Sequence, residues 1–484
     1  MKILTVEQLK AAERDAVSSG VLSFSDLMNT AAGKSAEYLI ENFSLNKAEV
    51  FVVCGNGNNG GDGIVLADLL KKTGCSVSVL FPFGKPDTFP AKEFLGCLDD
   101  IDEAQDIPEK CDLLVDAVFG IGLNRALDDF AADVIRKMNR CDAKKVAIDV
   151  PSGCFADGKG EGTAFRADIT LTFIALKPCF FLPPFNAYCG KVELIDKGVK
   201  SPEHAYMTIE RPKEIVRPKN SHKGTFGTVL TFTGSYGMCG ASVLSSKAAL
   251  VSGAGMVKSF VCDKNYSAFT CALPEAVTIP CETFASGAMA IYGDQLKKEL
   301  PFADSIIIGC GLGRTNEAVN LVKAILEMSC HPVVLDADGI NAVCGNIELL
   351  RKTKASVILT PHPGEMARLL RVPTDEIEKN RPEFAKRVAV TYGVVVVLKG
   401  ANTVVASPDG KVFFNTTGNP GMATGGSGDV LAGVIAARLA LGENAVDAAC
   451  NGVWLHGFAA DQALLKYSMA GLLPSDIIAE LKKL

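Results

Sequence analysis

The chain has 484 residues, of which 48% are hydrophobic and 21% charged, a composition typical of folded globular domains that excludes a disordered protein. Because one domain usually takes about 100 to 200 residues, we expect two or three domains. The formal net charge of -6 provides no basic surface field, so we expect neither a nucleic acid nor an anionic membrane as a partner.

The amino-terminal segment and the cysteines favour a cytoplasmic location. The apolar run before Glu7 is too short for the core of a signal peptide or for a membrane span. The 16 cysteines are scattered from Cys54 to Cys450 without a C-x-x-C pair, which favours reduced thiols over disulfides or a zinc site.

The first half of the chain predicts two helices followed by a sheet. Thr5 and Gln8 fit a capping box before a helix that extends to about residue 17, and a second helix is expected over 25–41. Short apolar runs then alternate with helical stretches such as 63–72 and 129–139, which is typical of a parallel sheet covered on both faces. These runs lie at 49–55, 76–83, 111–120, 144–153 and 168–174.

A second α/β domain is predicted after a linker. Residues 210–223 carry two prolines and several basic residues without apolar periodicity, so the boundary is expected near 205–222. The predicted domains are therefore residues 1–210 and 220–484. In the second, apolar runs lie at 227–235, 305–311, 332–339, 356–362 and 394–400, and helices are expected at 240–251, 318–328, 430–441 and 445–465.

The run CGNGNNGGDG at 54–63 follows the first predicted strand, where open α/β sheets bind ligands. It contains G-x-G-x-x-G, but Asp62 puts a negative charge where a pyrophosphate would lie, which argues against ordinary dinucleotide binding. Taken alone, Asp62 could simply cap the helix. Asp116 and Asp149 end two further strands, however, and three carboxylates at one edge of a sheet indicate a site that holds a cation or a proton.

These motifs resemble the NAD(P)HX epimerase domain over about residues 1–205. The resemblance is carried by GNGNNGGDG, DAVFGIGLNR, DVPSG and LKP, followed by GKVELIDKG. It implies a Rossmann-like three-layer fold, with potassium held by Asn59, Asp116 and Ser152. The substrate contacts that it implies are Asn58, Asn59, Gly60, Gly61, Asp62, Gly120, Ile121, Gly122, Leu123, Asn124, Arg125 and Asp149.

Asp149 is the expected catalytic group of this first domain. The hydrated nicotinamide ring carries its hydroxyl group on a carbon next to nitrogen, and that carbon is easily epimerised. A carboxylate such as Asp149 can shuttle the hydroxyl proton while the nitrogen lone pair opens either the C–O bond or the ring, and both routes stay open.

A second glycine-rich run, GNPGMATGGSGDV at 418–430, leads directly into a helix and predicts an anion site built from backbone amides. The chain has no G-x-x-x-x-G-K-[ST] motif, which excludes a Walker-type phosphate loop. Asp429 is not a phosphate ligand, but it can accept the proton of a hydroxyl group that attacks a phosphoryl group. The simpler alternative is that Asp429 only begins the helix.

GGSGD resembles the GAGD loop of ribokinase-like kinases, in which the Asp is the catalytic base. HKGTFGTVLTFTGS, GCGLGR, LDADGIN, TPHPGEM and KGANT extend the resemblance to the NAD(P)HX dehydratase domain, over about residues 220–484. Two departures affect loop shape: Cys310 stands where this family usually has proline, and Asn402 where it has glycine. The resemblance implies that Ala241, Gly311, His362 and Asp429 face the hydrated cofactor, and that Lys399, Gly400, Ala401, Asn402, Thr403 and Gly428 hold the nucleotide.

Together the two resemblances imply a repair enzyme for damaged nicotinamide cofactor. Its isomerase half would interconvert the epimers of NADHX and NADPHX with potassium. Its lyase half would dehydrate the S epimer with magnesium and ADP or ATP, of which the fused chain favours ADP. The alternatives are a small-molecule kinase of the ribokinase-like class and a non-catalytic nucleotide-binding protein, and a homo-oligomer is possible in each case.

Overall fold

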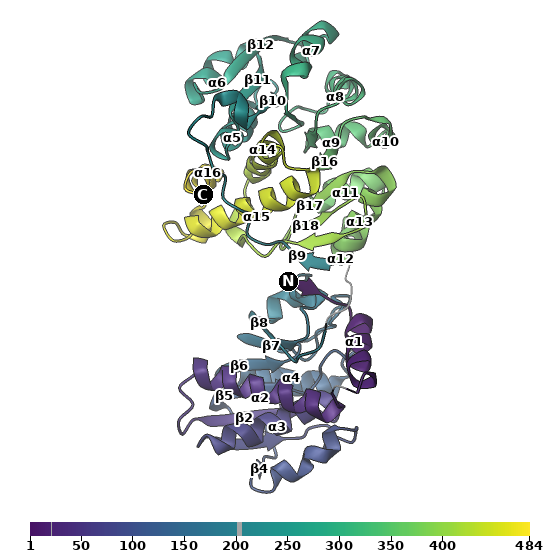
Figure 1. Ribbon diagram of the computed structural model, residues 1–484, viewed down its shortest axis with the longest axis vertical. Helices are drawn as coiled ribbons and strands as arrows, with labels where there is room; N and C mark the ends of the chain where they lie inside the picture. Colours follow the sequence, from purple (N-terminus) through teal and green to yellow (C-terminus); the bar gives the residue numbers. More distant parts are fainter. Residues whose placement is uncertain (21, 201–205) are drawn as a thin grey trace. The chain divides into compact units, whose positions relative to one another are not determined.

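The structure is a computed structural model that describes residues 1–20, 22–200 and 206–484. The chain divides into two compact units, Met1–His204 and Ala205–Leu484 (Figure 1). The expected boundary near 205–222 falls partly on residues outside the described part. Strand β9 (Tyr206–Thr208) pairs in parallel with β19 (Val412–Phe414) of the second unit, so this segment belongs to that unit and not to the first domain, where the sequence had placed it.

The first unit is built on a parallel sheet of seven strands in the order β4-β3-β2-β5-β6-β7-β8. These seven strands are β2 (Glu49–Cys54), β3 (Ser76–Leu80), β4 (Asp102–Glu103), β5 (Lys110–Ala117), β6 (Asp142–Ile148), β7 (Ile169–Phe173) and β8 (Lys191–Ile195). A short strand outside this sheet, β1 (Lys2–Ile3), precedes them in the chain. The α-helices of this unit are α1 (Val6–Ser18), α2 (Phe24–Asn42), α3 (Asn58–Lys72) and α4 (Asp129–Arg140).

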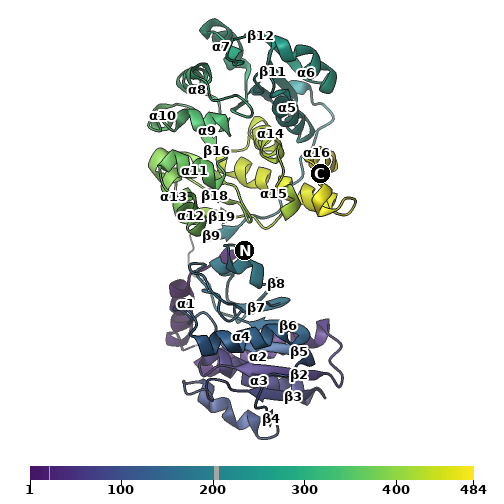
Figure 2. The ribbon, with the colours of Figure 1, turned by 180° about the vertical axis from the view of Figure 1, so that it is seen from behind.

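Helices cover both faces of this sheet because successive strand side chains point in opposite directions. Val50 and Val52 of β2 share a core with α2 and α3, whereas Phe51 and Val53 share another with α4. Figure 1 shows α2 in front of the sheet and Figure 2 shows α4 in front of it. The predicted Rossmann-like three-layer arrangement is confirmed.

The ends of the helices explain where the sequence prediction held and where it shifted. Helix α1 begins with the predicted capping box of Thr5 and Gln8. Helix α3 begins at Asn58 rather than at residue 63, because the glycines in the run do not break the helix. A Cβ on Gly60 would lie 1.9 Å from the carbonyl oxygen of Gly55, so glycine there lets the first turn of α3 lie directly against the end of β2.

The second unit contains a mixed sheet in the order β9-β19-β18-β17-β16-β15-β14-β10-β11-β12-β13. From β17 to β12 its strands are parallel, while β18, β19 and β13 form antiparallel pairs at the two sides. The strands not yet bounded are β10 (Thr228–Phe232), β11 (Met256–Cys262), β12 (Val277–Thr283), β13 (Met289–Ala290), β14 (Ser305–Ile308), β15 (Val333–Leu335), β16 (Val357–Leu359), β17 (Val395–Leu398) and β18 (Val404–Ala406).

Helices also lie on both sides of the second sheet. Figures 1 and 2 show α8, α11 and α13 on the side opposite α5. Helices α5, α14 and α15 share one core with the central strands, and the α/β class predicted for this domain is confirmed. The helices are α5 (Cys239–Val251), α6 (Tyr266–Ala272), α7 (Gly293–Glu299), α8 (Asn316–Met328), α9 (Asp338–Val343), α10 (Leu349–Lys352), α11 (Pro363–Leu370), α12 (Thr374–Lys379), α13 (Arg381–Tyr392), α14 (Ser427–Ala440), α15 (Ala445–Ala463) and α16 (Pro474–Leu481).

Helix α14 begins at Ser427, earlier than the predicted residue 430, so the GSGD run forms its first turn. Its glycines again serve close contact between elements. A Cβ on Gly433 would lie 2.2 Å from the carbonyl oxygen of Ser245, where α14 crosses α5. In the part of the chain that the structure describes, no helix has both the length and the apolar character needed to cross a membrane.

Candidate active sites

A cavity of about 750 Å³ opens in the first unit, beyond the carboxyl ends of β2, β5 and β6. The start of α3, the loop 118–128 and Asp149 line it, so the predicted motifs converge. Gly60 and Gly61 lie behind this lining, where Gly61 approaches the side chains of Met28 and Ala91. The predicted residues that line the cavity are Asn58, Asn59, Asp62, Gly120, Ile121, Gly122, Leu123, Asn124, Arg125 and Asp149.

Both carboxylate oxygens of Asp149 are held by hydrogen bonds. Lys177 Nζ donates to Oδ1 at 2.8 Å, and the backbone N–H of Ile121 donates to Oδ2 at 3.0 Å. The Lys177 side chain is 1% exposed and also donates to Thr172 Oγ1 at 2.5 Å and to the carbonyl oxygen of Phe173 at 3.0 Å. The φ angle of Asp149 is +70°, a strained value for a non-glycine residue of the kind often found at functional sites.

Asp62 faces the same cavity in a different environment. It lies inside α3, and Gly57 occupies the cap position, so the alternative that Asp62 caps the helix is wrong. Burial raises the pKa of Asp62 to about 7; the positive charge of Lys197 lowers it, while the negative charges of Asp149 and Glu13 raise it further. Two carboxyl groups of one cavity thus have different surroundings.

The residues expected to hold potassium lie beside and beneath the cavity. Asn59 has both polar side-chain atoms buried without a hydrogen-bond partner among the described residues. Asp116 is 0% exposed and accepts hydrogen bonds from Ser152 Oγ at 2.6 Å and from the Ser152 N–H at 2.7 Å. Burial raises the pKa of Asp116 to about 6, although these hydrogen bonds lower it. An unpartnered amide and a buried carboxylate with neutral donors suit a monovalent cation.

The second site lies at the start of α14, where no side chain caps the helix. Ligand atoms of Asp429, Asp336 and Cys310 all lie within 4.8 Å of one another. Burial raises the pKa of Asp429 to about 7, and the negative charge of Asp336 adds to this, while Cys310 and the positive charge of Lys399 lower it. Asp429 therefore holds its proton more readily than an ordinary carboxyl group does.

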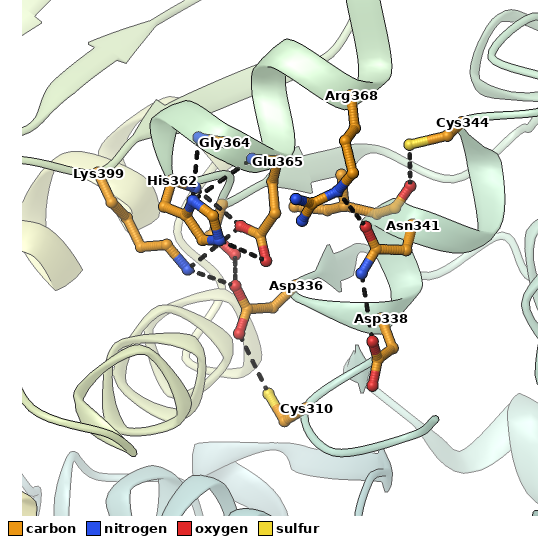
Figure 3. A network of polar contacts seen from close by, with 12 residues as sticks. Cys310, Asp336, Asp338, Asn341, Cys344, His362, Gly364, Glu365, Arg368 and Lys399 are labelled. Atoms are coloured by element: carbon orange, nitrogen blue, oxygen red, sulfur yellow. Dashed lines mark hydrogen bonds and ion pairs between the residues drawn. The ribbon is translucent and has the colours of Figure 1, made fainter. Parts of the chain in front are cut away.

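Asp336 is the centre of the polar network shown in Figure 3. Asp336 is 1% exposed. Its carboxylate accepts hydrogen bonds from Lys399 Nζ at 2.9 Å and Thr360 Oγ1 at 2.6 Å. Cys310 Sγ donates to its other oxygen at 3.5 Å. Lys399 also lies 3.9 Å from Glu365 Oε2, so two buried acids share one ammonium group beside Asp429.

His362 holds the start of α11 with one ring nitrogen, while its other ring nitrogen, Nε2, lies 3.5 Å from Glu365 Oε1. It precedes α11 as the cap residue, and its Nδ1 accepts from the Gly364 N–H at 3.0 Å. Because Nδ1 is an acceptor, Nε2 carries the proton of the neutral ring. Burial lowers the pKa of His362, which favours this neutral form, although the charge of Glu365 acts in the opposite direction. Half of the side chain remains exposed.

The residues expected to hold the nucleotide follow β17. A Cβ on Gly428 would lie 3.3 Å from Lys399 Nζ, so the glycine-rich turn and Lys399 are adjacent. Asn402, the departure from glycine, has a φ of +53° and donates from Nδ2 to the carbonyl oxygen of Asn415 at 3.0 Å. Asparagine tolerates this left-handed conformation better than most residues, so the substitution is compatible with the turn.

The other residues predicted to hold the nucleotide or the hydrated cofactor contact neighbouring residues as follows. Arg381 Nη2 donates to the carbonyl oxygen of Ala401 at 2.6 Å, and Thr403 Oγ1 donates to that of Gly400 at 3.1 Å. A Cβ on Gly311 would lie 2.9 Å from Ala241 Cβ, so Ala241 and Gly311 are direct neighbours.

Comparison with known proteins decides the family. A family model described as NAD(P)H-hydrate dehydratase matches residues 229–483, and one described as YjeF-related protein N-terminus matches residues 25–179. The bifunctional NAD(P)H-hydrate repair enzyme of Moorella thermoacetica is 34% identical over 509 residues, which cover 99% of this chain and 95% of that protein. This chain belongs to the family of bifunctional NAD(P)H-hydrate repair enzymes.

Two further proteins are similar to this chain. The bifunctional NAD(P)H-hydrate repair enzyme of Escherichia coli strain K12 is 33% identical and covers 99% of this chain and 93% of that protein. The solved ADP/ATP-dependent NAD(P)H-hydrate dehydratase of Bacillus subtilis, co-crystallised with ATP and Mg²⁺, is 34% identical, covers 55% of this chain and 92% of that chain, and has a TM-score of 0.48. The resemblance predicted for both halves is confirmed.

Sequence reasoning missed three charged residues in this member of the repair-enzyme family. Lys177 contacts Asp149, and Asp336 and Glu365 contact Lys399. Each lies in a quoted motif, namely LKP, LDADGIN and TPHPGEM, so the signal was present. The motifs did not show which side chains contact one another, because the distances between motifs are set only by the fold.

Proposed function

We propose that this chain repairs hydrated NADH and NADPH with two activities. The first unit would act as an NAD(P)HX epimerase, an isomerase. The second would act as an ADP- or ATP-dependent (S)-NAD(P)H-hydrate dehydratase, a lyase. The observation that carries the proposal is similarity over 99% of the chain to bifunctional repair enzymes, a span that includes both Asp149 and Asp429.

The cavity of about 750 Å³ is the proposed binding site for the hydrated nicotinamide. It is large enough for the ring and its ribose, since ligand cavities usually measure about 300 to 1,000 Å³. Asp149 would exchange the proton of the ring hydroxyl, because Lys177 holds its carboxylate in place. Asn58, Asp62 and the loop 120–125 would contact the substrate around it.

Asn59, Asp116 and Ser152 would hold potassium. The buried, unpartnered amide of Asn59 and the buried carboxylate of Asp116 fit this ion. When bound, potassium would neutralise the Asp116 charge and fix the amide at the edge of the cavity. Replacing potassium by tetramethylammonium in the epimerase assay tests this role, and an unchanged rate would argue against it.

In the second unit, Asp429 would remove the proton of the ring hydroxyl as its oxygen attacks the terminal phosphoryl group of the nucleotide. Phosphate then leaves as the nitrogen lone pair forms a C=N double bond, and loss of a proton from the adjacent ring carbon gives the C=C double bond of NADH or NADPH. The uncapped amides of α14 favour the negative phosphates. Lys399 and Gly428 would lie nearest to them, and Ala241, Gly311 and His362 would face the ring.

Magnesium would enter with the phosphates of the nucleotide. Asp336 is already paired with Lys399, and Asp429 has the role of base, so the residues at this site do not fit a separate protein-bound magnesium ion. Bound to the phosphates, magnesium would offset their charge. We further propose a cytoplasmic enzyme that takes small-molecule substrates alone and that can form a homo-oligomer.

The test of the proposed function is recovery of reduced-nicotinamide absorbance from a mixture of both epimers of hydrated NADH and of hydrated NADPH. The purified chain receives magnesium, potassium and either ADP, ATP or no nucleotide. Complete recovery with a nucleotide supports both activities and shows which donor is used. Recovery that stops at the initial fraction of one epimer would contradict the epimerase, and no recovery would contradict the whole proposal.

A further inference from the structure

Two carboxyl groups face the cavity of the first unit, and their contacts differ. Asp149 accepts one hydrogen bond from Lys177 Nζ and one from the Ile121 N–H, so both of its oxygens are engaged. Asp62 lines the same cavity from α3, and its carboxyl group makes none of the hydrogen bonds found in the described part of the chain.

The charges around Asp62 do not replace such a partner. Lys197 Nζ lies 3.3 Å from Glu13 Oε1 and 5.2 Å from the centre of the Phe173 ring, so its ammonium group is engaged elsewhere. Burial raises the pKa of Asp62 to about 7, with Lys197 lowering it and Asp149 and Glu13 raising it. The charged side chains that line the cavity with it are Lys10, Glu13, Arg125, Asp128, Asp149, Lys177 and Lys197.

We propose that Asp62 is a second catalytic residue of the epimerase, a proton donor that works opposite the proton acceptor Asp149. This inference rests on the proposed function of the first unit. Two carboxyl groups whose contacts differ in this way can divide the tasks of acid and base between them. Lys177 supplies the asymmetry, because its ammonium group contacts Asp149 and not Asp62.

The proton balance of epimerisation requires both groups when the ring opens. Asp149 accepts the proton of the ring hydroxyl, and the oxygen becomes the carbonyl oxygen of an aldehyde. The electron pair of the C–N bond moves to the ring nitrogen, which accepts the proton of Asp62. Closure on the other face of the aldehyde reverses both transfers, so the opposite epimer forms and each carboxyl group regains its starting state.

The experiment follows conversion of one purified epimer into the other without nucleotide, from about pH 6 to about pH 9, after subtraction of the uncatalysed rate. Because the donor must be protonated, the rate of the unaltered enzyme should fall as pH rises through about 7. Asp62→Asn should lower kcat by about 100-fold or more, with a smaller change in KM, and its remaining rate should no longer show this fall.

Two further variants make the result specific. Glu13→Gln removes a neighbouring carboxylate of the same cavity and should keep the fall but move it to lower pH, because Glu13 raises the pKa of Asp62. Asp62→Glu retains a carboxyl group and should recover part of the rate together with the fall. Dehydration of the purified S epimer by each variant should be unchanged, which reports on the intact second unit.

An unchanged kcat in Asp62→Asn, or a fall at high pH that persists in it, would overturn the inference while leaving the epimerase in place. Loss of the fall in Glu13→Gln with the rate at about pH 6 unchanged would assign the titration to Glu13 and would also overturn the inference. Absence of epimerisation in the unaltered enzyme is a separate result, because it contradicts the proposed function of the first unit itself.

Discussion

Lys177 and Asp149 form a buried ion pair, and removing one charge leaves the other without compensation. Lys177→Met should lower the free energy of unfolding of the first unit by about 3–5 kcal/mol and abolish epimerisation. The charge-balanced double variant Lys177→Met with Asp149→Asn should recover much of the stability but none of the activity. Chemical denaturation with both assays checks this; equal stability of the single and double variants would contradict it.

The ionised carboxylate of Asp429 is predicted to lower the stability of the fold while supporting activity. Its folded pKa, about 7, lies above the ordinary value of 3.8, so the folded chain binds more protons between these values and loses stability as pH rises through them. Asp429→Asn should therefore raise the melting temperature at pH 7–8 but not at pH 4, and should slow dehydration by about 100- to 10,000-fold.

The pH dependence of dehydration provides the matching kinetic measurement. A base must be ionised, so the rate of the unaltered enzyme should rise with pH up to about 7. Epimerisation by Asp429→Asn should persist. A lower melting temperature of Asp429→Asn at neutral pH would contradict the stability prediction, because it would show that the carboxylate makes stabilising contacts.

At this scale the sequence could identify the acids but not their partners. Asp62, Asp149 and Asp429 stand in motifs of recognisable chemistry, whereas Lys177 follows an apolar run and its contact with Asp149 spans 28 residues. Asp336 and Glu365 are similar cases, because each meets Lys399 only after separate strands are aligned in the sheet.

The glycines at the start of α3 are predicted to be required for packing. In Gly60→Ala the new Cβ would meet the Gly55 carbonyl oxygen at 1.9 Å, so the first turn must move, at a cost of about 1–3 kcal/mol. Epimerisation should fall because Asn59 and Asp62 lie on that turn. Gly57→Ala is the matched control, since no atom lies within 4 Å of its Cβ. Thermal unfolding of both variants tests this; equal stability would contradict it.

The strands show why prediction succeeded for continuous apolar strands at the centre of each sheet and failed for short or partly polar strands. Central strands such as β2 and β14 are continuous apolar runs because helices cover both of their faces. β11 contains Lys258 and Ser259, and β18 and β19 have three residues each, so none of the three displays such a run. The starts of α3 and α14 were placed late because glycine usually ends a helix.

On the scale of the whole molecule, the proposed activities depend on separate sites in separate units. Asp149→Asn should still dehydrate the S epimer, and Asp429→Asn should still interconvert the epimers. Mixing these two variants should therefore restore complete repair of an epimer mixture, because the substrate can diffuse between chains. Recovery of absorbance measures this. Failure of the mixture, with both single activities intact, would show that the two sites must share one chain.

The division into two α/β halves could be predicted because each half restarts the same alternation of strands and helices. The border was less certain, since β9 has only three residues and its pairing with β19 joins segments about 200 positions apart. The sequence provides no periodic signal for so short a strand.

The thiol of Cys310, which contacts Asp336 beside Asp429, has a consequence for durability under oxidative stress. Burial raises the pKa of this thiol well above its usual value, and the negative charges of Asp336 and Asp429 raise it further. Thiolates, not thiols, react with peroxides and alkylating reagents. Iodoacetamide should therefore label the exposed Cys271 and Cys330 long before Cys310, leaving dehydration active. The thiol beside Asp429 would thus stay unmodified under conditions that modify the exposed thiols.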